Sequence, residues 1–438
     1  MTWVNSDEDL AADVAVRLAR WAGGLQPTAE DLALAERSLR DTVAVAVAAR
    51  GHDVLEVARA LGEAGRWATA SHVIDYDDLH MESTTHISTV CVPVALATGG
   101  GARAYLAGAG VMARLGMSLG WRHYSSGWHA TTTAGALAAA VVAGVARGLD
   151  ADGLARAMAL AVPAAGGVQR AFGTDAKSLQ VGQAADAGVR AAGLAASGAT
   201  ADTGAVEDWL RLLGGDPAVV DVSGPAVPGG LAVKIYPACY ALQRPITAMR
   251  EAVRGVSVDP AAVRRIEVHT PAATVQPLIH HRPTDGLQGK FSLEYAVATA
   301  LLDERHGFEE FGDEAVRRPE ARRLVDLVDT VLEDSGDWLL AGTVRVVVHT
   351  DEECHEASLQ FPPGSPQRPP THDELGEKVA LCLDGSDVPA DEITWAGSAQ
   401  VLHRTLSLGL PRPTRIAGAA SSSSTTCRCP AVPAAQRH

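Results

Sequence analysis

Hydrophobic residues in the first half of the chain recur with the period of an α-helix. They stand at helical steps, first at Leu10, Val14, Leu18 and Trp21 and then at Leu32, Leu39 and Val43. From about residue 88 to 200 the sequence is almost wholly compatible with helix. The pattern therefore predicts an all-α first half.

Helix ends can also be placed from the sequence. Ser6 followed by Asp9, and Thr28 followed by Asp31, have the form of an N-cap with an acidic partner. Gly51 is a stop signal for the second helix. Small residues recur at helical spacing further on, which predicts a helix packed closely against a neighbour; they are Gly182, Ala185, Gly188 and Ala192.

The pattern changes near residue 225, at the Gly- and Pro-rich segment SGPAVPGG. After it, hydrophobic and polar residues alternate around Ile266 to Thr270 and around Val344 to Val348, as in half-buried strands. Helical patterns lie between these strands at 287–302 and 314–333. We expect a smaller α+β domain here. Thr371 with Glu374 then forms a capping box for a returning helix over 373–384, and the tail from about 417 has the composition of disorder.

Composition narrows the classes of function. The chain has 438 residues and a formal net charge of −15, with no run of Lys or Arg, which argues against a nucleic-acid partner. An anionic substrate would need a local cationic pocket. The first residues lack the pattern of a signal peptide and no apolar tract is long enough to span a membrane. The six cysteines lack zinc-site spacing, so a cytoplasmic location fits best.

Five segments contain residues that could take part in catalysis or bind a ligand. The first, SHVIDYDDLHMESTTH, gathers Asp and His residues between His72 and His86. It has the composition of a solvated acidic loop, and equally of a metal site, since Asp and His are ordinary ligands. DDLH is similar to the magnesium motif of terpene synthases, but the chain offers neither their second motif nor their aromatic lining. We therefore predict no metal.

The other four segments each contain a polar residue with an ordinary structural explanation. His129 precedes a Thr-rich helix start, where it could transfer a proton beside a bound carboxylate or simply cap the helix. Lys177 follows a Gly-Thr turn and could be a surface group. Lys234 and Cys239 lie in KIYPACYALQRP. Tyr295 in GKFSLEYAVATALL shares a helical face with hydrophobic residues, so core packing would explain it.

Taken together and in this order, the segments resemble the MmgE/PrpD family, which includes 2-methylcitrate dehydratase, cis-aconitate decarboxylase and an epimerase of iminodisuccinate. The resemblance spans about residues 30–385 and is carried by five motifs in order: Asp75, Asp77 and Asp78 with His86; Gly127, Trp128 and His129; Gly173, Thr174 and Lys177; Lys234, Tyr236, Pro237 and Cys239; and Lys290, Phe291, Ser292 and Tyr295. A late Gly364-Ser365-Pro366 stretch also matches.

The resemblance implies a mainly α fold with a smaller α+β domain. A large all-helical domain would be built from both chain ends, at 1–232 and 369–416, with an α+β lid inserted at 233–368 and a disordered tail at 417–438. It also implies an active site between the domains, no cofactor, a homodimer and a small polycarboxylate substrate.

The resemblance and the chemistry of proton removal α to a carboxylate suggest the site roles. We expect His129, His86 and Tyr295 to transfer protons, and Asp75 to orient a histidine. Lys177 and Lys234 would hold substrate carboxylates, with Cys239 and Lys290 also at the substrate. Leu79, Cys239 and Gln243 depart from the residues that relatives carry there. Dehydration, decarboxylation and epimerisation stay open, as does a non-catalytic carboxylate-binding relative.

Overall fold

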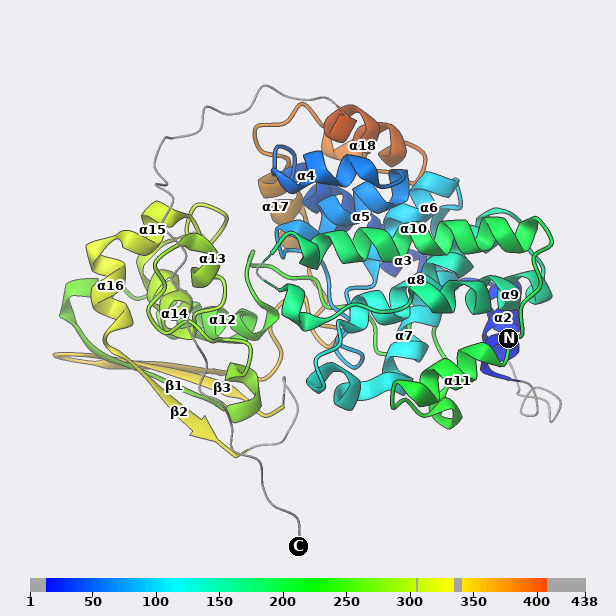
Figure 1. Ribbon diagram of the computed structural model, residues 1–438. Coiled ribbons are helices and arrows are strands. Elements are labelled where there is room, and N and C mark those ends of the chain that lie inside the picture. The colour runs from blue at the N-terminus through cyan, green and yellow to red at the C-terminus, as the bar shows by residue number, and fades with distance from the viewer. Residues whose placement is uncertain (1–12, 173, 305, 335–340, 408–438) are drawn as a thin grey trace, which may run out of the picture. The chain divides into compact units, whose positions relative to one another are not determined.

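The computed structural model describes residues 13–172, 174–304, 306–334 and 341–407. Figure 1 shows a large group of helices and a smaller group in which helices cover a sheet. The helices of the first half are α2 (Val14–Gly24), α3 (Ala29–Ala48), α4 (Val54–Val57), α5 (Glu63–Val73), α6 (Ser88–Thr98), α7 (Gly101–Ser125), α8 (Ala130–Ala146), α9 (Ala151–Ala161), α10 (Ala176–Ala196) and α11 (Ala205–Leu212). The predicted fold class, mainly α with a smaller α+β part, is confirmed.

The helix ends predicted from the sequence are confirmed where they fall on described residues. The capping box of Thr28 and Asp31 begins α3, and α3 ends at Ala48, shortly before Gly51 with its φ of +86°. Leu39 and Val43 are buried, whereas Leu32 is 46% exposed. The N-cap predicted at Ser6 lies outside the described residues, and α2 is capped by Asp13.

Helix α10 packs directly against α5 and α8. A Cβ added to Gly182 would lie 2.5 Å from the Gly65 carbonyl oxygen, and one added to Gly188 would lie 2.3 Å from Ala139 Cβ. Both contacts are too short for any side chain, so this close packing needs glycine. The small residues at helical spacing therefore act as predicted, and they bring the start of α10 to the end of α5.

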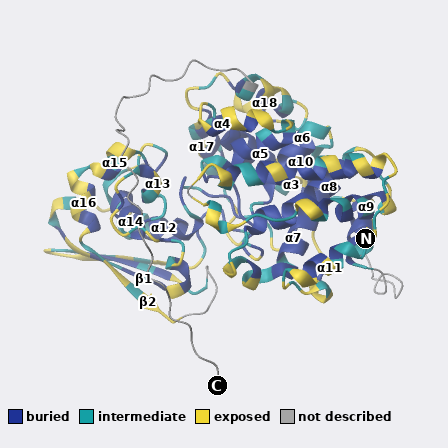
Figure 2. Cartoon of the chain, in the orientation of Figure 1, coloured by how far each residue is buried: buried dark blue, intermediate teal, exposed yellow. Residues whose placement is uncertain are grey.

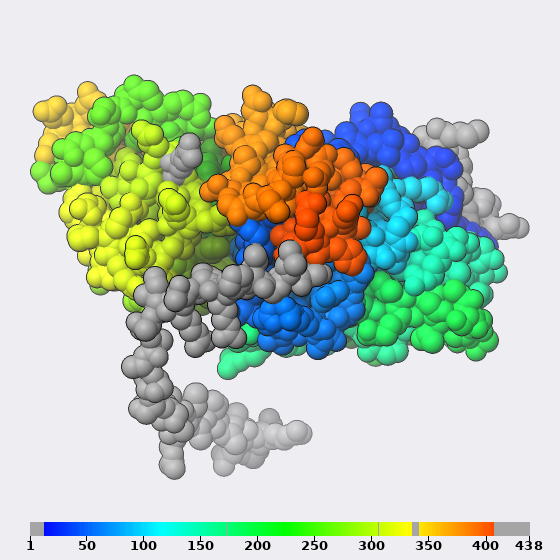
Figure 3. Space-filling model, turned by 90° about the horizontal axis from the view of Figure 1, so that it is seen from above, coloured from blue at the N-terminus to red at the C-terminus, as the bar shows by residue number. Residues whose placement is uncertain are grey.

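The C-terminal helices return to the first half of the chain. Helices α17 (His372–Leu383) and α18 (Ser398–Ser407) pack on α3, and Figure 3 shows their orange and red atoms against the blue N-terminal part. The Thr371–Glu374 capping box begins α17 as predicted. Lys378 of α17 forms an ion pair with Asp41 of α3, with both side chains buried. One hydrophobic core therefore contains residues of the N-terminal helices together with residues of α17 and α18.

The second part contains a four-stranded sheet in the order β2-β1-β3-β4. Strand β1 pairs parallel with β2 and antiparallel with β3, and β3 pairs antiparallel with β4. The elements of this part are α12 (Gln243–Ala252), β1 (Val263–Pro271), α13 (Gly286–Gly289), α14 (Leu293–Leu302), α15 (Asp313–Arg317), α16 (Pro319–Val325), β2 (Val328–Glu333), β3 (Val344–Thr350) and β4 (Cys354–Leu359). A second core lies between the sheet and its helices, while much of β2 is exposed (Figure 2).

Two helix predictions in this part need correction. The helix expected over 314–333 ends at Val325, and Val328–Glu333 is instead β2. Its β-branched residues pair with β1 at Ile266↔Val328 and onward, a long-range contact that outweighs local helix propensity. The helix expected over 287–302 is divided at Lys290 into α13 and α14. Among the described helices, none has both the length and the apolar character needed to cross a bilayer.

Candidate active site

The three carboxylates that follow α5 are all buried. The chain turns at Asp75, whose φ of +59° lies in the left-handed region, which Asp tolerates better than most residues. Asp75, Asp77 and Asp78 are 9%, 0% and 1% exposed. The interpretation of this segment as a solvated acidic loop is therefore wrong. A buried carboxylate needs a partner, and the partners of Asp75 and Asp77 differ.

Asp75 pairs with two lysines. Lys177 Nζ, in the first turn of α10, donates to Asp75 Oδ1 at 3.0 Å. Lys234 Nζ donates to the same oxygen at 3.3 Å and to the Asp75 carbonyl at 2.8 Å. Burial opposes ionisation of Asp75, but the positive charges of Lys177 and Lys234 outweigh it and hold the pKa of Asp75 well below its usual range. Asp75 therefore binds ammonium groups, and among the described contacts none joins it directly to a histidine ring, so its predicted role in orienting a histidine stays a prediction.

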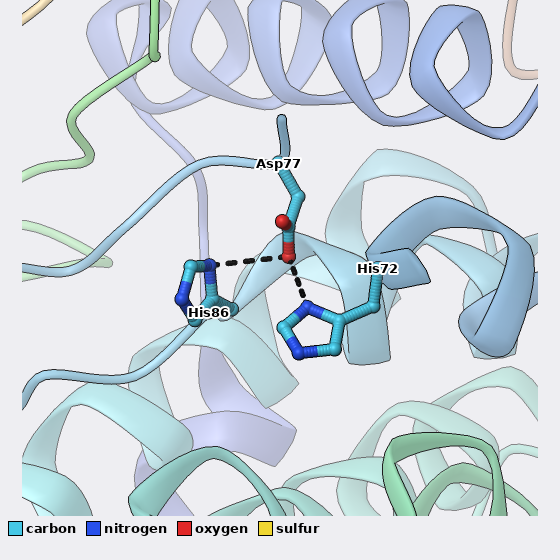
Figure 4. A group of neighbouring side chains, drawn as sticks. All are labelled: His72, Asp77 and His86. Carbon is cyan, nitrogen blue, oxygen red and sulfur yellow. Dashed lines mark hydrogen bonds and ion pairs between the residues drawn. The ribbon is translucent and has the colours of Figure 1, made fainter. Parts of the chain in front are cut away.

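Asp77 is the carboxylate that contacts histidines (Figure 4). Its Oδ2 accepts a hydrogen bond from His72 Nδ1 at 2.7 Å and lies 3.1 Å from His86 Nδ1. The second contact falls outside hydrogen-bond geometry, although it places the nitrogen against a carboxylate oxygen. Burial opposes the charge of Asp77, but His86 and His72 lower its pKa well below the usual value. Burial lowers the pKa of His72 to about 4, so a neutral His72 beside an ionised Asp77 is the stable state near neutral pH.

His86 is the most accessible of these histidines, with its side chain 16% exposed. Its backbone N–H donates to Thr131 Oγ1 at 3.0 Å, which ties it to the first turn of α8. The rings of His72 and His86 meet edge to face with centroids 5.0 Å apart. The imidazole of His86 therefore has a fixed carboxylate on one side and access to solvent.

His129 is the N-cap residue of α8, but its side chain makes no capping bond. Its Nδ1 accepts from Gln180 Nε2 at 2.5 Å, and its ring stacks on that of His72 with centroids 5.8 Å apart. Burial, followed by the nearby His72 and Lys177, lowers the pKa of His129 well below its usual value. The structure thus brings His129, His86, Lys177 and Asp75 into one cluster, and His129 is neutral within it.

Two residues of the α+β part reach the same cluster. Lys290 Nζ donates to the Ile74 carbonyl at 3.0 Å, and burial, with Lys234 and Lys177 nearby, lowers its pKa to about 8 although Asp75 opposes the shift. The backbone N–H of Cys239 donates to the Lys290 carbonyl. Burial and the charge of Asp75 raise the pKa of the Cys239 thiol to about 11, so this thiol is neutral.

All four lysines of the chain contact the same short segment. Lys177 and Lys234 reach Asp75 and Lys290 reaches the Ile74 carbonyl. Lys378 donates to the Tyr76 carbonyl at 2.8 Å. The chain's many other cationic side chains are arginines, so the lysine side chains are all gathered around residues 74–76.

Tyr295 is not part of the cluster. It is 1% exposed in the second core, its hydroxyl donates to the Glu310 carbonyl at 2.5 Å, and its ring meets Phe311. Core packing therefore explains these contacts, and a catalytic role for Tyr295 stays a prediction. Its hydrophobic neighbours on α14 belong to the same core.

Gln243, one of the departures from the family pattern, has a structural role. Its amide accepts from the backbone N–H groups of Ile235 and Tyr236, both at 3.0 Å, and donates to the Tyr236 carbonyl. It therefore shapes the loop that presents Lys234. Leu79 belongs to a small apolar cluster with Met81, Ala232 and Tyr240.

Sequence reasoning missed three residues of the cluster as site residues, His72, Asp77 and Gln180. Asp77 and His72 stand in the quoted acidic segment, but nothing in the sequence says which aspartate faces which histidine. Gln180 lies one helical turn after Lys177, so helical spacing alone could have placed it beside the cluster. Gly173 of the same motif lies outside the described residues.

Among the described residues, one group could hold a metal ion: His72, Asp77 and His86, whose ligand atoms lie within 4.8 Å of one another. Tetrahedral ligands about 2.0–2.2 Å from a zinc ion would stand well over 3 Å apart. The 2.7 Å between His72 Nδ1 and Asp77 Oδ2 is instead the length of a charge-assisted hydrogen bond. These residues therefore fit a carboxylate–imidazole network better than a coordination shell.

Two family models match the chain. The MmgE/PrpD N-terminal domain matches residues 64–210, and the MmgE/PrpD C-terminal domain matches residues 236–397. The first match contains Asp75, Asp77, His86, His129 and Lys177, and the second contains Cys239 and Lys290. A search of curated proteins finds no match. The two domain matches together cover well over half of the sequence and occur in the order of the motifs, and the chain belongs to the MmgE/PrpD family.

Proposed function

We propose that the protein is a cofactor-free lyase of the dehydratase type, acting by proton transfer at the carbon α to a carboxylate of a small polycarboxylic acid. The observation that carries this proposal is the grouping of three lysines, of which Lys234 is buried and Lys177 and Lys290 are partly buried, and a neutral His129 around the two ionised carboxylates of Asp75 and Asp77. Family membership supports an enzyme of this general kind.

The charges of the cluster favour an anion. Three ammonium groups outnumber the carboxylates of Asp75 and Asp77 by one, in a chain whose formal net charge is −15. Each ammonium group has three donors, and the contacts described for Lys177 and Lys290 use only part of them. The remaining donors suit substrate carboxylates. The partly exposed side chains of Asp75, His86 and Lys177 mark the side from which a small anion would enter.

The residue types match the chemistry of elimination. Removal of a proton α to a carboxylate builds negative charge on that group, which fixed ammonium groups stabilise. An imidazole must accept the proton, and the hydroxyl on the neighbouring carbon must leave with a proton as water. His86 and His129 are the imidazoles available for these tasks. Decarboxylation or epimerisation of a related acid would use the same grouping and are alternatives to dehydration.

We also propose a cytoplasmic location and a homodimer. The described cysteines are all free thiols, which suits a reducing compartment such as the cytoplasm. The family resemblance makes a homodimer the expected assembly.

The proposal is tested by incubating purified protein in deuterium oxide with citrate-like, aconitate-like and iminodisuccinate-like acids. Ultraviolet absorbance reports alkene, and mass spectrometry reports deuterium on carbon. We expect an alkene signal together with deuterium exchange for one hydroxy acid. Exchange without alkene would indicate an epimerase, released carbon dioxide would indicate a decarboxylase, and neither signal with any acid would contradict the proposal.

A further inference from the structure

We infer that Gln180 and Asp77 fix the two site imidazoles in opposite tautomers, so that His86 acts as the base while His129 stays neutral and serves only as a hydrogen-bond donor. Gln180 and Asp77 are then positioning residues for this site. The catalytic part of the inference rests on the proposed function, whereas the tautomers can be observed directly.

The amide of Gln180 is oriented by the backbone. Its Oε1 accepts from the Val168 N–H at 3.3 Å and its Nε2 donates to the Val168 carbonyl at 3.4 Å. With both ends of the amide assigned in this way, Nε2 is the atom 2.5 Å from His129 Nδ1. An amide nitrogen can only donate. His129 Nδ1 must therefore carry the lone pair, and a neutral His129 carries its proton on Nε2.

The backbone of His129 is fixed as firmly as its ring. Its N–H donates to the Gly167 carbonyl at 3.0 Å, and its own carbonyl accepts from the hydroxyls of Thr132 and Thr133 at 2.9 and 3.1 Å. The Thr-rich start of α8 thus holds the histidine in place, and Gln180 determines which ring nitrogen presents a proton.

Asp77 imposes the reverse arrangement on His86. A carboxylate oxygen 3.1 Å from His86 Nδ1 favours a proton on that nitrogen, which leaves the lone pair on Nε2. The same oxygen receives the Nδ1 proton of His72. Of the two imidazoles assigned to the substrate, only His86 therefore offers a basic Nε2.

These tautomers give each imidazole one task. His86 Nε2 takes the proton from the carbon α to the carboxylate, and the electrons of that C–H bond become the new carbon–carbon double bond. The bond from the neighbouring carbon to its hydroxyl breaks, and the hydroxyl leaves as water with the proton that His86 returns. His129 Nε2–H meanwhile donates to the oxygen on which charge develops and keeps its proton, as a neutral imidazole can.

The test uses full-length protein labelled with ¹⁵N-histidine and the Gln180→Glu variant. A carboxylate at position 180 accepts from Nδ1–H, so it should reverse the His129 tautomer and remove the Nε2 donor. Long-range proton–nitrogen spectra separate protonated from unprotonated ring nitrogens, and a His129→Asn variant identifies the signals. We expect an Nε2–H His129 in the wild type, loss of that tautomer in Gln180→Glu, and turnover reduced by about 10²–10³-fold, as when one preorganised donor is removed.

Gln169→Glu is the matched control. Gln169 Nε2 donates to the Tyr124 and Trp128 carbonyls at 2.6 and 3.1 Å, so it supports the same region without touching a histidine ring in any described contact. Its variant should leave the His129 signals unchanged. A wild-type His129 protonated on Nδ1 would overturn the inference, and so would full turnover in a Gln180→Glu protein whose tautomer has reversed. Absence of any turnover in the wild type would instead contradict the proposed function, while the spectra still decide the tautomers.

Discussion

Lys177 Nζ lies 3.0 Å from Asp75 Oδ1, across 102 residues of sequence. The contact joins the first turn of α10 to the turn after α5, and the glycines that let α10 approach α5 make it possible. Lys234 meets the same oxygen. Asp75 thereby gathers two cations at one point in an acidic chain, and substrate binding should depend on that point.

Replacement of Lys177 should weaken substrate binding more than it weakens the fold. Lys177→Ala removes one charge-assisted donor, which contributes roughly 1.5–3 kcal/mol. Lys234 still compensates Asp75, so the melting temperature should change little. The measurement is kcat/KM alongside thermal unfolding, with Arg170→Ala as a control for loss of an exposed nearby charge. Unchanged kinetics in Lys177→Ala would mean that this lysine does not meet the substrate.

Replacement of Lys378 should lower the stability of the folded protein. The Lys378–Asp41 pair is fully buried, with Nζ 2.5 Å from Oδ1, and holds α17 on α3. Burial raises the pKa of Asp41, and the ammonium group of Lys378 limits that rise. Lys378→Met leaves a buried carboxylate without its partner, and such changes cost about 3–5 kcal/mol.

Urea denaturation measures this loss, and the double variant Asp41→Leu, Lys378→Met provides the control. Replacing both partners by apolar groups should recover most of the stability. If the single variant lost less than about 1 kcal/mol, in the range of exposed pairs, the pair would have to be solvated rather than buried.

Substrate affinity should fall as the pH rises above about 8. The pKa of Lys290 is lowered to about 8, first by burial and then by Lys234 and Lys177 against Asp75, so Lys290 loses its charge above that pH and a polycarboxylate loses one cation. KM should therefore rise with little change in kcat. Lys290→Arg, which stays charged, should flatten this dependence; an unchanged pH profile in that variant would assign the effect to another group.

The lowered pKa of Lys290 also makes the stability of the folded protein depend on pH. Between about pH 8 and its usual pKa of 10.5, the unfolded chain binds the Lys290 proton more readily than the folded one does. Folding stability contributed by this group therefore rises with pH over that range. Affinity and stability should thus move in opposite directions, which separates loss of substrate binding from alkaline unfolding.

Exhaustive chelation should leave activity intact. The His72–Asp77 spacing of 2.7 Å is that of a hydrogen bond, and the adjacent lysines already provide positive charge. The measurement is turnover after dialysis against a chelator, with and without added magnesium or zinc. Activity that disappears and returns with either ion would show that His72, Asp77 and His86 bind a metal.

The sequence predicted features that depend on local pattern. The helical first half, the capping boxes at Thr28 and Thr371 and the close packing of α10 all follow from periodicity and residue size. Strand β2 was mistaken for helix because its partner β1 lies more than 60 residues away in register. The exposure of Leu32 could not be predicted, because spacing identifies a helical face but not how far the neighbouring helices cover it.

The candidate site, too, could be predicted only in part from the sequence. Residue types and motif order placed His86, His129, Lys177 and Lys234 near one another. They could not decide among three neighbouring aspartates, because a positive φ at Asp75 turns its carboxylate to the lysines and leaves Asp77 to the histidines. The role of Tyr295 could not be decided from the sequence, because a hydroxyl on an apolar helix face has the same sequence pattern in a core as in a site.

The most direct test of the account is deuterium incorporation at the carbon α to a carboxylate, compared between wild type and His86→Ala in the presence of a chelator. Wild type should incorporate deuterium from solvent into at least one polycarboxylic acid. His86→Ala should lose about 10²–10⁴-fold in that rate while unfolding at nearly the same temperature. Equal exchange rates in the two proteins, or no exchange by the folded wild type with any acid of the panel, would contradict proton transfer by this cluster.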